Sequence, residues 1–227
     1  DSMLTYKIPA QHYMKFHGAP LVAFTAYYLI KKVAQFEKNE SIVIHGAAGG
    51  VGTTAIQIAK YLGAKQIIGT VSRQTKVKAA FDAGADYVVV TTEENTTEKI
   101  LDYTNGQGVD VILDSIAGET SEDSFAYLKK YGRLVVFGDS SGGPAQISSH
   151  LLHSSCRSVL GYSIGTMRND RPHLLKEVSQ DVISLITDNH VKIHIGAEFQ
   201  LEQAIQAHEL MESRDALGKI IIHVAEN

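Results

Sequence analysis

The chain has 227 residues, of which 44% are hydrophobic and 20% charged, and its formal net charge is −4. This composition is typical of a globular protein. It shows neither the basic excess of a nucleic-acid-binding protein nor an apolar run of roughly 20 residues, so we expect no nucleic-acid and no membrane partner. A single cysteine and the lack of a basic-then-apolar leader at the start of the sequence favour the cytoplasm.

The sequence from Ser41 onward alternates short β-branched runs with helical patterns. Before it, residues 1–40 predict a linker and one amphipathic helix over 25–36. Alternation of strand and helix implies right-handed crossovers, so we predict an α/β fold of Rossmann type over 41–227, a doubly wound parallel sheet with helices on both faces. The expected strands are 41–46, 65–71, 86–90, 109–114, 133–138 and 219–224. The expected helices between them are 53–63, 75–84, 97–106 and 119–132.

The segment 139–171 is rich in Gly, Ser and His and predicts a loop that contains one short strand, SVLGY at 158–162. Two further helices are expected after it, over 172–190 and 201–213. A strand at 158–162 that lies at an edge of the sheet can pair with its twin across a two-fold axis. We therefore expect a homodimer.

Four glycines lie between His45 and Thr53, in the sequence HGAAGGVGT. They follow an expected strand and open an expected helix, the setting in which a Gly-x-x-Gly-x-x-Gly pattern indicates dinucleotide binding. In such a turn Gly49 and Gly50 bring the backbone close to a pyrophosphate, and Gly52 allows the helix to pack tightly on the sheet. The N–H groups and positive dipole end of the helix favour phosphate charge. A glycine-rich turn without a ligand is the alternative.

Basic and hydroxyl side chains follow the second expected strand, at the position where an NAD-binding protein places an acid on the ribose 2′-hydroxyl. Here the strand is followed by Ser72, Arg73 and Lys76, and no acid is present. Guanidinium and ammonium groups pair well with phosphate oxygens, so the sequence favours NADP(H) over NAD(H). The alternative is that Arg73 and Lys76 are ordinary solvated residues at the start of a helix.

Two further strand ends should face the same crevice, because ligands of open α/β sheets lie beyond the carboxyl ends of the strands. The fourth strand ends in Asp114-Ser115, and the fifth is followed by GDSSGG. We expect Ser115 and residues 137–141 to line the nicotinamide half of the cofactor. Plain polar turns have the same composition and are the alternative.

The blocks TAYYLIKK, HGAAGGVG, AGADYVV, GVDVILDSIAG, GRLVVFGDSSG and ESRDALGKIII occur in an order that resembles zinc-free quinone oxidoreductases of the medium-chain dehydrogenase/reductase superfamily. The resemblance spans nearly the whole chain. It implies NADPH-dependent hydride transfer to a quinone or an α,β-unsaturated carbonyl, with Thr25 and Tyr27 near the nicotinamide as candidate catalytic residues. The motif and the resemblance together give these cofactor-binding residues: Gly46, Ala48, Gly49, Gly50, Val51, Gly52, Ser72, Arg73, Lys76, Ser115, Phe137, Gly138, Ser140, Ser141 and Lys219.

Two features depart from the family pattern. Thr91 stands where many relatives place a tyrosine against the adenine. The family also carries a catalytic domain before the segment that begins this chain, and that domain supplies much of the substrate pocket. We therefore expect the chain to be the cofactor-binding part of a reductase. An enoyl reductase of fatty-acid or polyketide synthesis and a non-catalytic nucleotide-binding module are the alternatives.

Potential metal ligands occur at helical spacing at His150, His153 and Cys156. Zinc sites use three or four ligands, and this set needs a further residue such as Asp139 or His173 to complete it. We expect no metal site and interpret the three residues as part of a polar loop.

Overall fold

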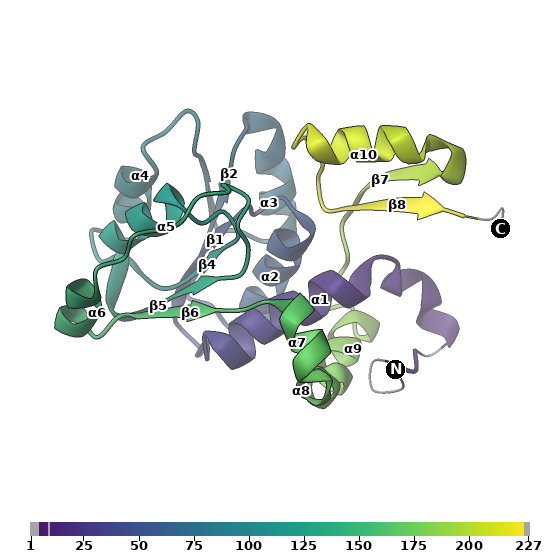
Figure 1. Cartoon of the computed structure of the whole chain (residues 1–227), viewed down its shortest axis with the longest axis horizontal. Coiled ribbons are helices and arrows are strands. Elements are labelled where there is room, and N and C mark those ends of the chain that lie inside the picture. The colour runs from purple at the N-terminus through teal and green to yellow at the C-terminus, as the bar shows by residue number, and fades with distance from the viewer. Residues whose placement is uncertain (1–4, 9, 225–227) are drawn as a thin grey trace.

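A six-stranded parallel sheet forms the centre of the structure, a computed structural model that describes residues 5–8 and 10–224. Its strands are β1 (Ser41–His45), β2 (Gln66–Val71), β3 (Tyr87–Val90), β4 (Val109–Asp114), β5 (Leu128–Val136) and β6 (Ser158–Gly161). Their order in the sheet is β3-β2-β1-β4-β5-β6, so the chain runs outward from β1 to one edge and then from β4 to the other (Figure 1). This is the doubly wound arrangement that the sequence predicts.

Helices cover both faces of this sheet (Figure 1). They are α1 (Ala19–Tyr28), α2 (Gly50–Tyr61), α3 (Val77–Ala83), α4 (Thr96–Tyr103), α5 (Glu119–Asp123), α6 (Ser149–Ser155), α7 (Ile164–Asp170), α8 (Pro172–Glu177) and α9 (Ser179–Thr187). One more helix, α10 (Ala204–Glu212), lies away from this sheet. Ile42 and Ile44 of β1 belong to the core formed with α1, α2, α3 and α9, whereas Val43 between them packs with α4 and the segment after α5. Both faces are buried, which explains why the strands read as continuous apolar runs.

A second sheet, of two parallel strands, lies apart from the first (Figure 1). Its strands are β7 (Ile195–Gln200) and β8 (Lys219–His223), and α10 packs on the pair. The last predicted strand is therefore present, but the prediction that it joins the main sheet is wrong. Sequence reasoning missed β7 because its residues alternate between half-buried and exposed positions and form no apolar run.

The structure corrects two other predictions of secondary structure. The helix expected over 119–132 ends early, because α5 has only five residues and the chain is already extended at Leu128. Just before this point the carbonyl group of Tyr127 accepts a hydrogen bond from the N–H group of Val109, at 2.8 Å, so strand pairing replaces the helix. The segment 139–171, expected to be a loop around one strand, also contains α6 and α7.

The first helix is longer than the sequence indicates. It begins at Ala19, where Pro20 occupies the first turn as its fixed backbone angle allows, and it continues into a π-helical turn over Leu29–Val33. Strand β6 is an edge strand of the main sheet, as predicted, because in the described part of the chain it pairs with β5 alone. Among the described residues, no helix has the length and apolar character needed to cross a membrane.

Candidate functional site

The turn between β1 and α2 is built from glycines. Gly46 has a left-handed backbone, with φ of +65°, and Gly49 caps the N-terminus of α2, where Val51 is half-buried. A Cβ atom on Gly52 would lie 2.3 Å from the carbonyl oxygen of Gly46 and 2.8 Å from two backbone atoms of Ala47. These distances leave room only for glycine, because the first turn of α2 lies directly on the preceding turn.

Three loops meet at the carboxyl edge of the main sheet. Ser115, after β4, places its Oγ 3.1 Å from the position that a Cβ on Gly46 would take. Ser140, after β5, donates its backbone N–H to the carbonyl oxygen of Ser115, at 3.2 Å. A Cβ on Gly138 would lie 2.8 Å from the same oxygen, so the β5 loop approaches the β4 loop as closely as a glycine allows. The structure therefore brings together predicted site residues from three strands.

Asp114, the last residue of β4, stabilises these loops through hydrogen bonds. Its side chain is fully buried and accepts hydrogen bonds from the N–H groups of Ile116 and Ala117, at 2.7 and 3.2 Å. Phe137 donates its N–H to the carbonyl group of Asp114, and Ser141 donates to that of Ile116, both at 2.8 Å. Asp114 is therefore a structural residue that fixes the loops after β4 and β5.

The C-terminal part of the chain reaches the same glycine turn. Gly218 donates its N–H to the carbonyl oxygen of Ala48, at 2.8 Å. A Cβ on Gly50 would lie 2.9 Å from Cδ of Lys219 and 3.0 Å from a methyl group of Val22 on α1. Gly50 therefore lies where α1, α2 and β8 pack closely together, and Lys219 lies along the first turn of α2.

The two cations after β2 are paired within the chain. The guanidinium group of Arg73 forms an ion pair with the carboxylate of Asp215, and the ammonium group of Lys76 donates to the carbonyl group of Arg214. Burial lowers the pKa of Lys76, and the negative charge of Asp215 opposes that shift. Ser72 is exposed beside them. Sequence reasoning missed Asp215 because it lies 142 residues after Arg73 and no local pattern links the two.

The two candidate catalytic residues lie on α1, and their hydroxyl groups already have partners. Thr25 is 5% exposed, and its Oγ1 donates to the carbonyl oxygen of Leu21, at 2.7 Å. Tyr27 is 8% exposed, and its hydroxyl donates to the carboxylate of Asp181 on α9, also at 2.7 Å. Burial, together with Asp181, raises the pKa of Tyr27 well above its usual value. For either residue to act in catalysis, its hydroxyl group has to leave its present hydrogen-bond partner and donate to the substrate instead.

A buried polar cluster lies beneath the glycine turn, and sequence reasoning missed it. His45 is 2% exposed, with Nδ1 2.8 Å from the hydroxyl oxygen of Thr70 and Nε2 3.2 Å from that of Ser124. The hydroxyl group of Tyr127 lies 3.3 Å from the same Nε2. Burial lowers the pKa of His45, an effect that the charge of Asp114 opposes. A neutral His45 therefore joins β1 to β2 and to the segment after α5.

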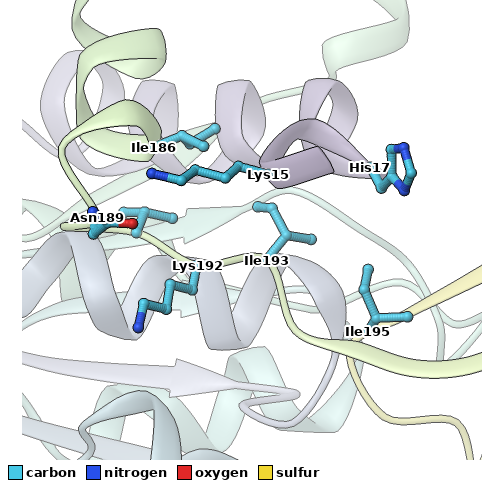
Figure 2. Close-up of a pocket in the computed structure, with 8 residues that line it drawn as sticks. Lys15, His17, Ile186, Asn189, Lys192, Ile193 and Ile195 are labelled. Atoms are coloured by element: carbon cyan, nitrogen blue, oxygen red, sulfur yellow. The ribbon is translucent and has the colours of Figure 1, made fainter. Parts of the chain in front are cut away.

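A cavity of about 200 Å³ lies between the segment before α1, helix α9 and the residues that lead into β7 (Figure 2). Its wall combines branched aliphatic side chains with two lysines. It is lined by Lys15, His17, Ile186, Asn189, Val191, Lys192, Ile193 and Ile195. None of the predicted site residues lines this cavity, so it is separate from the loops at the carboxyl edge of the sheet.

A second cavity, of about 550 Å³, borders the carboxyl end of β6. Tyr162 lines it and is 9% exposed, and its ring stacks on that of Tyr28 with the centroids 5.3 Å apart. Its hydroxyl group has no hydrogen-bond partner in the described part of the chain. This cavity lies at the same edge of the sheet as the predicted site residues, since β5 and β6 are parallel neighbours.

The histidines and the cysteine considered as metal ligands lie on or next to α6. His150 and His153 are exposed on this helix, and Cys156 caps its C-terminus with an exposed thiol. Within the described ranges, no group of three or more His, Cys, Asp or Glu side chains is arranged to hold a metal ion.

Comparison with known proteins identifies the family of this chain. The family model described as zinc-binding dehydrogenase matches residues 50–180, which is more than half of the sequence. The chain belongs to the zinc-binding dehydrogenase family. Quinone oxidoreductase 1 of Escherichia coli is 34% identical to this family member over 213 residues, and the match covers 89% of this chain and 62% of the relative. The chain therefore spans about three fifths of the length of the curated quinone oxidoreductases it matches.

Solved structures agree with this assignment to the zinc-binding dehydrogenases. The structure of Escherichia coli quinone oxidoreductase complexed with NADPH is 34% identical, with a TM-score of 0.79, and the match covers 90% of this chain and 64% of that one. Highly reducing polyketide synthase 40 of Fusarium mangiferae is also similar, 29% identical over 97% of this chain and 9% of the synthase. The predicted resemblance to quinone oxidoreductases and the predicted Rossmann-type fold are confirmed.

Proposed function

We propose that this chain binds NADPH at the carboxyl edge of the main sheet and presents it for reduction of a quinone or an α,β-unsaturated carbonyl. One observation carries the proposal: the glycine turn after β1 lies beside two cations, Arg73 and Lys76, that follow the neighbouring strand β2. The similar quinone oxidoreductase of Escherichia coli, complexed with NADPH, supports the choice of cofactor.

The glycine turn fits a pyrophosphate. Gly49 is extended, with ψ of 173°, and opens a helix of twelve residues whose positive dipole end faces the turn. Apart from the two adjacent residues, one atom of the described chain lies within 4 Å of the position of a Cβ on Gly49, the carbonyl oxygen of Gly46 at 3.3 Å. The space outside Gly49 is therefore open to a phosphate group, whereas the space at Gly52 is filled by the backbone.

The remaining predicted residues divide between the two ends of the cofactor. Ser72, Arg73 and Lys76 supply the hydrogen-bond donors and the positive charge for an adenosine 2′-phosphate. Ser115 and the loop after β5 lie beyond the ends of the next strands, where the nicotinamide half of a dinucleotide binds in this fold. When bound, NADPH supplies a hydride, and the substrate gains that hydride together with one proton. The chain holds the reacting groups in line and excludes water.

Thr25 and Tyr27 are the proposed donors to the substrate oxygen, on which negative charge develops during hydride transfer. Both hydroxyl groups are buried and paired, so each has to exchange its partner when substrate binds. Substitution of either residue should lower turnover more than NADPH affinity. Turnover equal to that of the unmodified protein would remove both residues from the mechanism.

The proposal extends to the organisation of the protein. Residues 1–40 connect the Rossmann domain, residues 41–227, to a catalytic part of the kind that the relatives carry.

The edge strand β6 supports a homodimer in which two sheets join across a two-fold axis. The single cysteine, which is exposed and free, supports a reducing compartment such as the cytoplasm. Light scattering tests the dimer, and a monomer would contradict it.

The match to a polyketide synthase favours a second candidate, reduction of an enoyl thioester. The fold and the cofactor are the same for both candidates, so substrate choice separates them. We expect the full-length protein, with its catalytic part, to oxidise NADPH faster with a quinone than with an enoyl thioester of similar size, measured by the loss of nicotinamide absorbance. A preference for the thioester would favour the second candidate. Oxidation with neither substrate would contradict both.

A further inference from the structure

The connection between α10 and β8, residues 213–218, is anchored to the glycine turn. Gly218 donates its N–H to the carbonyl group of Ala48 and forms a bridge with Gly49. It has φ of +51°, and a Cβ there would lie 2.2 Å from the carbonyl oxygen of His194. Because no larger residue fits, this end of the connection is fixed beside the proposed pyrophosphate site.

The other end of the connection covers the two cations after β2. Asp215 places its carboxylate on the guanidinium group of Arg73, and the carbonyl group of Arg214 accepts from the ammonium group of Lys76. The N–H group of Asp215 donates to Oγ of Ser213, at 3.2 Å, which holds the turn in shape. The connection therefore spans the proposed cofactor site, from the pyrophosphate to the 2′-phosphate. Figure 1 shows it next to the layer of α2 and α3.

A carboxylate and a phosphate bind a guanidinium group through the same N–H donors. Asp215 therefore occupies donors that the 2′-phosphate of NADPH needs. The ion pair is half exposed, with 52% of the Arg73 side chain and 45% of the Asp215 side chain accessible to solvent. Because pairs this exposed contribute little stability, a more highly charged phosphate is able to displace the carboxylate.

We propose that Asp215 is a displaceable counter-ion at the 2′-phosphate site and that it limits the preference of this chain for NADPH over NADH. The inference rests on the proposed binding of NADPH. NADH carries a hydroxyl group at the same position and leaves the pair between Arg73 and Asp215 in place. NADPH has to break the pair, so part of its binding free energy is spent there.

Asp215→Asn tests the inference, since it removes the charge and keeps the size of the side chain. Calorimetric titration of the 227-residue chain should show about three- to fivefold tighter binding of NADPH and of 2′,5′-ADP, and unchanged binding of NADH. A fivefold gain corresponds to about 1 kcal/mol. The matched control is Glu212→Gln, which removes the same charge from an exposed position at the end of α10 and should change each affinity by less than about twofold.

Arg73→Ala makes the possible outcomes distinguishable. If this variant weakens binding of 2′,5′-ADP while Asp215→Asn leaves it unchanged, the counter-ion role is wrong and the proposed NADPH site stands. If Arg73→Ala leaves the binding of 2′,5′-ADP and NADPH unchanged, the phosphate site is wrong and the inference falls with it. An equal gain in affinity from Glu212→Gln would show a general effect of charge and would also overturn the role of Asp215.

Discussion

Replacement of Gly52 by alanine tests how α2 packs on the glycine turn. The added Cβ would lie 2.3 Å from the carbonyl oxygen of Gly46 and 2.8 Å from two backbone atoms of Ala47. Carbon and oxygen atoms that are not bonded to each other usually stay about 3.3 to 3.6 Å apart. The first turn of α2 therefore has to move by about 1 Å relative to the turn before it, and that shift also displaces the proposed phosphate-binding backbone.

The expected cost follows from two opposing effects. Overpacking of a well-packed site costs about 1–3 kcal/mol. The greater helix propensity of alanine returns at most about 1 kcal/mol. The clash is with backbone atoms, which cannot rotate away, so the upper end of the overpacking cost applies and the free energy of unfolding should fall by about 2 kcal/mol. Loss of one charge-assisted hydrogen bond to the pyrophosphate should weaken NADPH binding about tenfold.

Urea denaturation measures the first effect, and calorimetric titration with NADPH measures the second. Gly165→Ala is the matched control, because Gly165 lies in the first turn of α7. Among the described residues outside its own helix backbone and its chain neighbours, its Cβ would meet only Oγ of Ser163, at 3.7 Å. This variant should be as stable as the unmodified protein or more stable. Equal stability and equal NADPH affinity in the Gly52 and Gly165 variants would refute the packing argument.

Two further substitutions test buried polar groups. Tyr27→Phe leaves the carboxylate of Asp181 without its donor, so urea denaturation should show a loss of about 1–2 kcal/mol. Tyr131→Phe, at a side chain that is 72% exposed, should show none, and equal losses in the two variants would contradict the bond. Burial lowers the pKa of His45, so only the unfolded chain takes up this proton as the pH falls below about 6.5. The free energy of unfolding should then fall by up to about 1.4 kcal/mol per pH unit. The variant His45→Gln should flatten that slope between about pH 7.5 and 5.5, and an unchanged slope would contradict a neutral His45 in the folded protein.

The main sheet could be predicted from the sequence because its strands are buried on both faces. Ile42, Val43 and Ile44 alternate between two cores, so they form an apolar run between polar boundaries. The glycine turn could also be predicted, because positions where no side chain fits require glycine, and these positions have a fixed spacing in the sequence. Local chemistry determines both features, and short stretches of sequence therefore contain the information.

The parts that the sequence did not reveal depend on contacts between distant residues. Tyr27 donates a hydrogen bond to Asp181, which lies 154 residues later in the sequence, and Arg73 pairs with Asp215, which lies 142 residues later. The pairing of β7 with β8 likewise depends on where the chain returns after α10, and β7 has no apolar run of its own. Such contacts are set by the packed fold, so composition and periodicity at either end give no sign of them.

Binding of the two dinucleotides to the unmodified chain tests the central claim most directly. Calorimetric titration should give a dissociation constant for NADPH that is about tenfold lower than that for NADH, because a 2′-phosphate gains charge-assisted hydrogen bonds from Arg73 and Lys76. Tighter binding of NADH, or no binding of either dinucleotide, would contradict the account.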